Sequence, residues 1–515
     1  MRISFSLIPQ FSVVHLFGPA RQEVTSIAYN SHQVQNGSVF FCIEGENTDG
    51  HLYIEQAIQQ GAMTIVGSQA DILQSFSQKH PARTFLHVKN TKEALAYFSI
   101  YFYENAKDHL VKVGVTGTNG KTTVATFVSS LFNLLDIDCG LLGTTGIWTK
   151  EGKLEFEKST PTTPMAPNIH QIFHKLVASN HKAAAMEVSS ISLDQKRVEG
   201  IRFDVAIHTN VSEEHMEYHR TMDHYTQSKL QLFKQAKTSV VNVDDQEMAS
   251  RILAIADHPV ITYSRRVESG ADLVWGNCEH HEEGMAFDLT WQDVTERIEV
   301  PLYGEYNIGN LTAAIGAALL IGVEMEDILA VLPQMPQVEG RFQTIQTAGR
   351  KVILDYAHTP VALKSVLDEV KKIPHSRLIA MIAGIGIRDF GKMPKMAKAA
   401  DGEADVLIVT VDHPGYHDPE EIVNQVMTGF AVPHNQPIYQ TTSRSEGVRR
   451  ALEKSGEGDI VLLTSGCING AQIVKGKSIP HSDEKIIKEY FQSEIDSRNV
   501  YQHAEEQQGD SHVWF

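Results

Sequence analysis

A loop rich in glycine and hydroxyl side chains, GTNGKTT at residues 117–123, has the clearest chemistry in the sequence. It follows the β-branched run VKVGVT and precedes a helical pattern with apolar residues at i, i+3 and i+4. Gly117 and Gly120 permit a tight turn whose N–H groups face phosphate oxygens, and Lys121 adds a positive charge. The loop predicts nucleotide binding, although it is shorter than the strict GxxxxGK[ST] motif. The alternative is a glycine turn with a solvated lysine.

A second polar cluster, VDHPGYHDP at residues 411–419, follows the apolar run ADVLIVT. The run reads as a buried strand, so the cluster lies at the carboxyl end of that strand, where open α/β sheets bind ligands. Its carboxylates and imidazoles, Asp412, His413, His417 and Asp418, suit either a metal ion or a polar substrate. Both alternatives stay open on the residues alone.

Three further polar side chains could be either functional or structural. Glu187 ends the strand-like run AAAMEV, His215 follows the run FDVAIHTN, and Lys229 lies in the helical pattern YTQSKLQLF. A carboxylate suits a hard cation such as Mg²⁺, whereas histidine is a less usual ligand with a partly positional role. The ordinary alternatives are a helix-capping carboxylate, a surface histidine and a solvated lysine.

The elements that must position these groups alternate between strand-like and helical patterns. This alternation predicts an α/β fold in which parallel sheets are joined by crossover helices. We expect three domains, with a central mostly parallel sheet of the P-loop ATPase type and a C-terminal Rossmann-like α/β domain. The predicted strands are KVGVT, AAAMEV, DVAIHTN, SVVNV, VILDYA, LIAMIAG and DVLIVT.

Two boundaries divide the chain. One lies near residues 90–110, and the other is the Pro- and Gly-rich stretch LPQMPQVEGR at residues 332–341. They predict domains at residues 1–105, 106–336 and 337–515.

The composition limits the classes of partner. The chain has 515 residues, 42% of them hydrophobic, and a net charge of −18, which argues against a general nucleic-acid or membrane-surface binder. The four cysteines form no CxxC pair, which is typical of thiols in a reducing compartment. The N-terminal apolar region is interrupted, and the longest apolar helical pattern is too short to span a bilayer. We expect a cytoplasmic protein without nucleic-acid or membrane partners, and a monomer.

GTNGKTT and further stretches resemble the Mur ligase family in order across most of the chain. The stretches are TSIAYNSHQVQNGSVFFCIEGENTDGH, PTTP, MEVSSISLDQKRVEG, FDVAIHTNVSEEHMEYHRTMDHYTQSKLQLF, YNIGNLTAAIGAA, EGRFQTI and DYAHTPVALKSVL. Mur ligases join an amino acid to a UDP-sugar peptide in peptidoglycan synthesis. MEVSS…LDQKRVEG and DYAHTP are most similar to the UDP-N-acetylmuramoyl-tripeptide synthetases, which add a diamino acid to UDP-MurNAc-L-Ala-D-Glu.

The resemblance implies that ATP activates a carboxylate as an acyl phosphate, which an amine then attacks. It implies Mg²⁺ held by Thr122, Glu187, His215 and Lys229, with Lys229 carrying a carbamate formed from CO₂. The implied catalytic residues are Lys121, Lys229, His215 and Arg341. The implied ATP-binding residues are Gly117, Thr118, Asn119, Gly120, Lys121, Thr122, Thr123, Asn307, Asn310, Arg341, Asp355 and His358. An amide can pair with a base edge, although a helix cap is the ordinary alternative for the asparagines.

The resemblance also assigns the substrates to domains. The first domain binds the UDP-sugar peptide, the central domain binds ATP and the third binds the amino acid. The implied UDP-substrate residues are Ser31, Thr162, Thr163, Ser189, Gln195 and Arg197, together with GENTDGH at 45–51. Two stretches depart from the family, because NSH replaces DSR at 30–32 and Ile191 replaces a histidine.

The third domain departs further. The implied amino-acid-binding residues are Arg388, Asp412, His413, Pro414, Gly415 and Asn469. Ile387 replaces an Asp of the family pattern, DHPG at 412–415 replaces the Asp-Asn-Pro-Arg of diaminopimelate enzymes, and Asn469 stands at or near a family Glu. Without the Arg, a buried carboxylate would stay unpaired at an expense of about 3–5 kcal/mol.

The sequence therefore predicts an ATP-dependent ligase that acts on a UDP-MurNAc-dipeptide-like acid, a specialised paralogue with a non-standard amine. One alternative is a ligase of the same fold with a non-UDP acid, of the folylpolyglutamate or cyanophycin type. The other is an ATP-binding regulatory protein without ligase activity.

Overall fold

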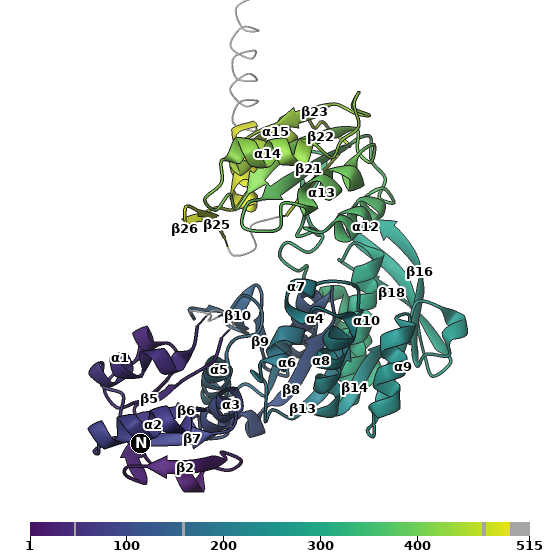
Figure 1. The fold of residues 1–515 in the computed structure, drawn as a ribbon. Helices are drawn as coiled ribbons and strands as arrows, with labels where there is room; N and C mark the ends of the chain where they lie inside the picture. Colours follow the sequence, from purple (N-terminus) through teal and green to yellow (C-terminus); the bar gives the residue numbers. More distant parts are fainter. Residues whose placement is uncertain (46–47, 157–159, 466–469, 495–515) are drawn as a thin grey trace, which may run out of the picture. The chain divides into compact units, whose positions relative to one another are not determined.

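The computed structural model describes residues 1–45, 48–156, 160–465 and 470–494. Figure 1 shows its helices and strands and labels many of them. The chain divides into two units. The first consists of Met1–Gly276, Leu289–Glu296 and Asn310–Leu332, and the second of Asn277–Asp288, Arg297–Gly309 and Pro333–Phe515.

A five-stranded sheet near the N-terminus has the order β2-β7-β6-β5-β4 and is parallel except at the edge strand β2. Alternate side chains of β5 enter two different cores: Val39 and Phe41 pack into one, and Phe40 into the other. The strands are β2 (Val13–Phe17), β4 (Ser26–Ala28), β5 (Ser38–Phe41), β6 (Thr64–Gly67) and β7 (Thr84–Val88). The helices are α1 (Ile54–Gln59), α2 (Ala70–Lys79) and α3 (Thr91–Phe102), and β1 (Arg2–Ser4) pairs with β3 (Arg21–Glu23).

The largest sheet has eleven strands in the order β11-β10-β9-β12-β8-β13-β14-β15-β16-β17-β18, and its strands from β9 to β16 are parallel. The strands are β8 (Val111–Thr116), β9 (Cys139–Gly143), β10 (Gly146–Thr149), β11 (Gly152–Leu154), β12 (Ala183–Glu187), β13 (Phe203–His208), β14 (Ala236–Asn242), β15 (Val260–Ser264), β16 (Leu273–His281), β17 (Gly284–Trp291) and β18 (Val294–Val300). The helices are α4 (Lys121–Leu134), α5 (Ala166–Ala178), α6 (Ser190–Asp194), α7 (Met216–His219), α8 (Met222–Lys234), α9 (Gln246–Ile255), α10 (Glu305–Leu320) and α11 (Met325–Val331).

The predicted phosphate loop joins β8 to α4. The strand β8 lies between β12 and β13 in the middle of this sheet. The apolar face predicted for the helix is buried, as Val124, Phe127, Val128 and Leu131 are each at most 1% exposed. The loop is therefore held at both ends by the core of the first unit.

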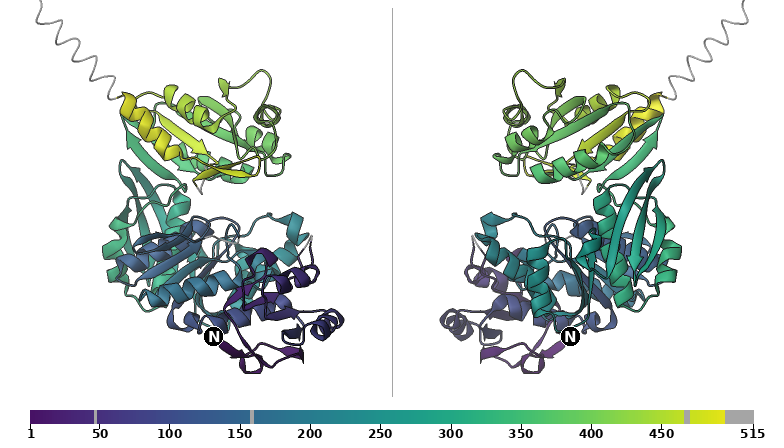
Figure 2. Two further views of the ribbon diagram at one scale, coloured as in Figure 1. Left: turned by 90° about the vertical axis from the view of Figure 1, so that its left-hand side faces the viewer. Right: turned by 90° about the vertical axis from the view of Figure 1, so that its right-hand side faces the viewer.

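The second unit contains a six-stranded sheet of order β19-β20-β24-β21-β22-β23, in which only β19 runs antiparallel to its neighbour. Two core clusters place α12, α13 and α14 on one face, and α15 with the helical residues 483–494 on the other (Figure 2). The elements are β19 (Gln343–Thr347), β20 (Arg350–Asp355), α12 (Pro360–Val370), β21 (Leu378–Ile385), α13 (Lys392–Ala400), β22 (Val406–Asp412), α14 (Pro419–Met427), β23 (Ile438–Gln440), α15 (Arg444–Glu453), β24 (Ile460–Thr464), β25 (Ala471–Val474) and β26 (Lys477–Pro480).

These sheets confirm the predicted α/β class, and all seven strands expected from the sequence are present. The division into three domains stays a prediction. None of the helices in the described part of the chain combines the length and the apolar character needed to cross a bilayer.

A buried ion pair fixes one face of the second sheet and gives a first prediction. Arg444, 1% exposed, donates to the Asp483 carboxylate at 2.5 and 3.1 Å, and His481 lies 2.7 Å from the same carboxylate. Burial opposes ionisation, but Arg444 and His481 hold the pKa of Asp483 well below its usual range. Asp483→Asn should therefore lower the free energy of unfolding by about 3 kcal/mol near neutral pH.

The difference has a definite pH dependence. Because the folded-state pKa is depressed, the stabilisation is complete above the unfolded carboxyl pKa of about 4 and is lost as the pH falls below it. Urea unfolding of both proteins from about pH 6 to about pH 2.5 measures this difference. If the difference in free energy of unfolding between variant and wild type stays constant over this pH range, the stabilising role of ionised Asp483 is contradicted.

Candidate active site

The phosphate loop is braced by the segment that follows β13. Thr118 N–H donates to the carbonyl of Asn210 at 2.7 Å, and Asn119 N–H donates to the Asn210 side chain at 3.0 Å. The Lys121 ammonium donates to the carbonyls of Gly117 and Thr118, both at 2.8 Å. The lysine is thus folded over the loop at the N-terminus of α4, a position that favours anions.

Gly117 cannot be replaced without moving this brace. A Cβ added to it would lie 1.8 Å from the Thr209 hydroxyl oxygen. Gly117→Ala should lower the free energy of unfolding by about 1–3 kcal/mol and weaken ADP binding, as measured by denaturation and titration calorimetry. Gly276→Ala is the control, because a Cβ there meets nothing within 4 Å. Equal behaviour of the two variants would show that the loop tolerates the displacement.

Two of the predicted metal ligands are in direct contact. Glu187, 1% exposed at the end of β12, accepts a hydrogen bond from the Thr122 hydroxyl at 3.0 Å. Its carboxylate also accepts from the Thr144 amide at 2.6 Å and from the Thr144 hydroxyl at 3.2 Å. A carboxylate beside a hydroxyl at the start of α4 is a set of oxygen donors that fits Mg²⁺.

Lys229 is not a solvated helix lysine. Its side chain on α8 is buried, its amine donates to the Gly117 carbonyl at 2.7 Å, and it lies 4.4 Å from the centre of the Tyr225 ring. Burial, followed by the charge of Lys121, sets the pKa of the Lys229 amine well below its usual value. The two predicted catalytic lysines therefore meet at one carbonyl, and the buried one favours the neutral form.

His215 stands at the start of α7 with a positive φ of 59°. Its ring is 41% exposed, and within the described residues its polar side-chain contacts are with Glu217 at 3.5 Å and Glu214 at 3.9 Å. Its role as a metal ligand stays a prediction.

The predicted UDP-substrate residues of the large sheet gather at the end of β12. The Thr163 hydroxyl donates to the carbonyl of Glu187 at 2.9 Å and accepts from the Ser189 amide at 3.0 Å. Arg197 donates to the Thr163 carbonyl at 2.9 Å and to the Gln195 side chain at 2.6 Å. Thr162 and Thr144 place their hydroxyls 3.4 Å apart. Ser31 lies in a short 3₁₀ turn that connects β4 to β5.

The predicted nucleotide residues fall in both units. Asn310 belongs to the first unit, and its side chain lies close to Gly120 of the phosphate loop. A Cβ added to Gly120 would be 2.7 Å from the Asn310 side-chain oxygen. Asn307 belongs to the second and donates to the Tyr303 carbonyl at 2.8 Å.

Arg341, Asp355 and His358 also belong to the second unit. The Arg341 guanidinium lies 4.8 Å from the centre of the Tyr356 ring. Burial raises the pKa of the Asp355 carboxyl against the opposing charge of Arg341. Burial, followed by the charge of Arg388, lowers the pKa of His358 to about 3, so its ring is neutral.

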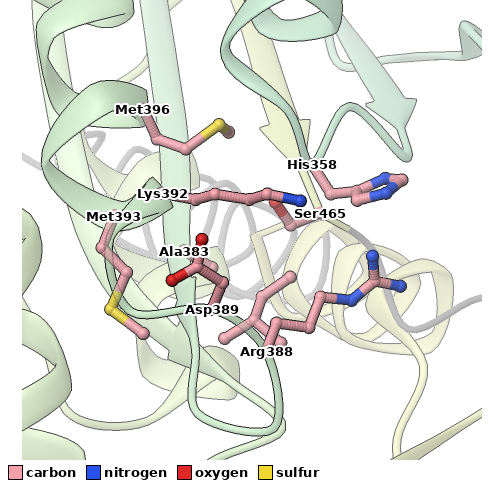
Figure 3. A pocket seen from close by; sticks show the side chains of 9 residues that line it. His358, Ala383, Arg388, Asp389, Lys392, Met393, Met396 and Ser465 are labelled. Carbon is pink, nitrogen blue, oxygen red and sulfur yellow. The ribbon is translucent and has the colours of Figure 1, made fainter. Parts of the chain in front are cut away.

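A pocket that is partly open to solvent lies within the second unit at the carboxyl ends of β20, β21 and β24. Lys392 extends from α13 across it toward His358 and Ser465, and Arg388 enters from the loop after β21 (Figure 3). The full lining is His358, Ala383, Ile385, Arg388, Asp389, Lys392, Met393, Met396 and Ser465. The pocket therefore brings together a predicted ATP residue, His358, and a predicted amino-acid residue, Arg388.

The loop at 412–415 is clamped to the hairpin of β25 and β26. Asp412, fully buried, accepts from the Gln472 side chain at 3.0 Å, and His413 Nδ1 accepts from the Ile473 amide at 3.0 Å. The Gly415 amide donates to the Ile473 carbonyl at 2.9 Å. Asp412 and His413 thus hold the hairpin, and their roles as amine ligands stay predictions, as does that of Pro414.

Gly415 itself has a φ of +63°, and a Cβ added to it would lie 2.8 Å from Cγ2 of Ile387. Positions 387 and 415, two of those at which the sequence departs from the family pattern, are therefore neighbours in space. Asn469, also predicted to bind the amino acid, lies outside the described residues.

Comparison with known proteins identifies the family. The models for "Mur ligase family, catalytic domain", "Mur ligase middle domain" and "Mur ligase, glutamate ligase domain" match residues 23–103, 115–318 and 340–467. A "UDP-N-acetylmuramoyl-L-alanyl-D-glutamate--2,6-diaminopimelate ligase" of Clostridium botulinum is 34% identical over 91% of this chain and 95% of its own. The chain belongs to the Mur ligase family. A Bacteroides thetaiotaomicron protein of the same name is 32% identical over 94% of this chain and 99% of its own.

Solved structures agree with the Mur ligase fold. A structure titled as a UDP-N-acetylmuramoyl-L-alanyl-D-glutamate--2,6-diaminopimelate ligase matches 96% of this chain and all of its own with a TM-score of 0.68 and 26% identity. MurF ligase from Thermotoga maritima, titled as a complex with ADP, matches 92% of this chain and 99% of its own with a TM-score of 0.61 and 17% identity, a likeness of fold. This Mur ligase is accordingly an ATP-dependent ligase.

Some residues of this Mur ligase were not among the predicted site residues. Thr144 donates two hydrogen bonds to the Glu187 carboxylate. In the sequence, the only signal for this residue was its position in the loop after the apolar run CGLLG. Asp389, Lys392 and Ser465 line the pocket of the second unit. For Asp389 and Lys392 the sequence did contain a signal, because both lie close to Ile387 in the stretch GIGIRDFGKMP at 384–394, where the sequence departs from the family pattern.

Proposed function

We propose that this Mur ligase activates the carboxylate of a UDP-MurNAc-dipeptide-like substrate with ATP and joins it to an amino acid other than diaminopimelate. The phosphate loop, the buried Glu187 beside Thr122 and the names of the relatives support the first part. The glycine at position 415, packed beside Ile387, supports the second.

The residues that would hold Mg²⁺ are Thr122, Glu187, His215 and a carbamylated Lys229. Bound there, the ion would offset the negative charge of ATP facing a carboxylate. Lys121 supplies a fixed positive charge at the same loop, and Thr144 keeps the Glu187 carboxylate oriented through two hydrogen bonds.

The environment of Lys229 supports the carbamate. A neutral amine adds to CO₂, forming an N–C bond and releasing one proton to water, which leaves an anionic carbamate. Burial at 1% exposure and the neighbouring charge of Lys121 favour the neutral amine that this step needs. An anion at this position would in turn pair favourably with Lys121 and with a divalent ion.

The acid substrate is then activated by attack of its carboxylate on the γ-phosphorus of ATP, which releases ADP and leaves an acyl phosphate. The amine attacks the acyl carbon, an amide forms and phosphate leaves. Thr163, Ser189 and Arg197, at the end of β12, are the groups we assign to the UDP-peptide side. Arg341, Asp355 and Asn307 are assigned to the nucleotide on the family resemblance.

Gly415 is the observation that supports an amine substrate other than diaminopimelate. Diaminopimelate has a second carboxylate, which would need a cation that this position does not supply. Leaving it unpaired in a buried site would weaken binding by about 3–5 kcal/mol. An amino acid with one carboxylate avoids this penalty, and Arg388 in the pocket can bind that single group.

Phosphate release with UDP-MurNAc-L-Ala-D-Glu, ATP, Mg²⁺ and a panel of amino acids tests the proposal. We expect release that depends on a monocarboxylic amino acid and little with diaminopimelate. Diaminopimelate as the best amine would contradict the specialised role. Release only with a non-UDP acid would favour the folylpolyglutamate-type alternative. The absence of amine-dependent release with any acid would favour the regulatory alternative.

A further inference from the structure

A chain of polar side chains joins three helices of the first unit beside the proposed metal site. The Asp194 carboxylate, at the last residue of α6, accepts from the Tyr218 hydroxyl at 2.6 Å. Its other oxygen lies 3.0 Å from Nε2 of His224 in the first turn of α8. One carboxylate thus ties α7 and α8 to α6.

The chain continues inward from His224. Nδ1 of His224 lies 3.2 Å from the carbonyl of His219 and 3.4 Å from its Nδ1. Nε2 of His219, a residue only 2% exposed, lies 2.9 Å from the Ser190 hydroxyl in the first turn of α6. Both ends of α6 are therefore bonded to the α7 segment.

The charges along this chain are consistent with its geometry. Burial opposes ionisation of Asp194, but the hydrogen bonds from Tyr218 and His224 hold its pKa below the usual range. Burial, followed by repulsion from His224, lowers the pKa of His219 to about 4. An ionised carboxylate therefore faces two donors, and a neutral imidazole lies behind them.

The backbone conformation of His215 depends on the hydrogen bonds that hold α7 to α6. His215 directly precedes α7, and its carbonyl accepts from the amides of Tyr218 at 3.1 Å and His219 at 3.0 Å. Its φ of 59° is a left-handed conformation that costs a non-glycine residue about 1–2 kcal/mol. Such a conformation persists only where the surroundings enforce it. Tyr218 and His219 are the two residues that the chain fastens to α6.

We propose that Asp194 is a positioning residue that, through Tyr218 and His224, fixes α7 and hence His215 relative to α6, the helix that follows Glu187. The proposal rests on the proposed function, in which His215 and Glu187 serve one metal ion. This role requires no contact between Asp194 and the ion or the substrate. Removal of Asp194 should impair the binding of Mg²⁺ more than the chemical step.

Asp194→Ala and the shape-conserving Asp194→Asn test this role. Loss of a group that orients a metal ligand typically lowers metal affinity about 10- to 100-fold. We expect Asp194→Ala to raise the Kd of ADP in the presence of Mg²⁺ by about 10-fold in titration calorimetry. ADP binding in EDTA should be unchanged. In turnover, the Mg²⁺ concentration for half-maximal rate should rise similarly, and saturating Mg²⁺ should restore kcat.

Asp223→Asn is the matched control. Asp223 is an exposed carboxylate on the same helix α8 that pairs with Arg251 at 3.2 Å. It should leave both Mg²⁺ measurements unchanged. Tyr218→Phe should weaken Mg²⁺-dependent ADP binding less than Asp194→Ala, and the double variant should be no worse than Asp194→Ala, because both changes break one chain.

The outcomes separate the two proposals. If Asp194→Ala and Asp194→Asn both bind ADP with Mg²⁺ as Asp223→Asn does, the positioning role is wrong. A kcat loss that excess Mg²⁺ does not restore also overturns it. If the wild type ligates no acid, while Mg²⁺-dependent ADP binding still weakens in Asp194→Ala, the proposed ligation fails and the positioning role stands.

Discussion

Lys229→Ala is expected to lower the rate of ligation by at least about 100-fold, the usual result of removing a charge-stabilising group from a dry active site. The variant loses the amine on which the carbamate forms and leaves a small space above the Tyr225 ring. Added formate or acetate should restore part of the rate, because a short carboxylate can occupy the place of the missing anion. Phosphate release with and without these ions is the measurement.

Lys234→Ala is the control, since Lys234 ends the same helix at an exposed position. It should show wild-type rates with no response to formate. Carbon-13 NMR after equilibration with labelled CO₂ gives a second readout, with a carbamate signal in the wild type and none in Lys229→Ala. Full activity of Lys229→Ala without added carboxylate would overturn the carbamate proposal.

The double variant Ile387→Asp with Gly415→Arg is expected to raise kcat/KM for diaminopimelate by about 100-fold or more. This is the size of effect expected when a buried, unpaired charge gains a partner. The Arg supplies the missing cation, and the shorter Asp removes the Cγ2 methyl that would lie 2.8 Å from the new Cβ. Gly415→Arg alone should achieve less. Its Cβ would lie 2.8 Å from Cγ2 of Ile387. The backbone φ of +63° costs the single and the double variant alike about 1–2 kcal/mol.

Rates with diaminopimelate and with the best monocarboxylic amine, measured side by side, give the preference. Gly402→Arg is a suitable control, because Gly402 also has a positive φ, +74°, but lies in the turn after α13. It should leave the preference unchanged. If the double variant folds and its preference equals that of the wild type, the 412–415 loop is not the selector of the amine.

The sequence predicted the parts of this molecule that depend on local pattern. The buried strand VKVGVT, the turn at Gly117 and the apolar face of α4 are adjacent in the chain, so their periodicity and composition were sufficient. The end of β12 was also predictable, because Glu187 follows a run of small apolar residues whose length fits a buried strand.

What the sequence could not predict depends on residues that are distant in the chain. Burial of Lys229 results from packing of α8 under the phosphate loop, 112 positions earlier, and a lysine in a helical pattern otherwise predicts exposure. The contact between Gly415 and Ile387 and the bond from Ile473 to His413, 60 positions apart, require the folded second sheet. Such contacts leave no periodic signal along the chain.

The clamp between the 412–415 loop and the β25–β26 hairpin has a consequence for how amine preference can change. Both backbone groups of Gly415 are occupied by the hairpin, its amide by Ile473 and its carbonyl by Lys475. A mutation at this position is therefore epistatic with Ile387 and with the hairpin, and single substitutions in this region should be mostly neutral or harmful. During evolution, a change of the amino acid that is ligated would therefore require paired replacements. An engineered change of this preference should likewise replace the 412–415 loop, Ile387 and the β25–β26 hairpin together.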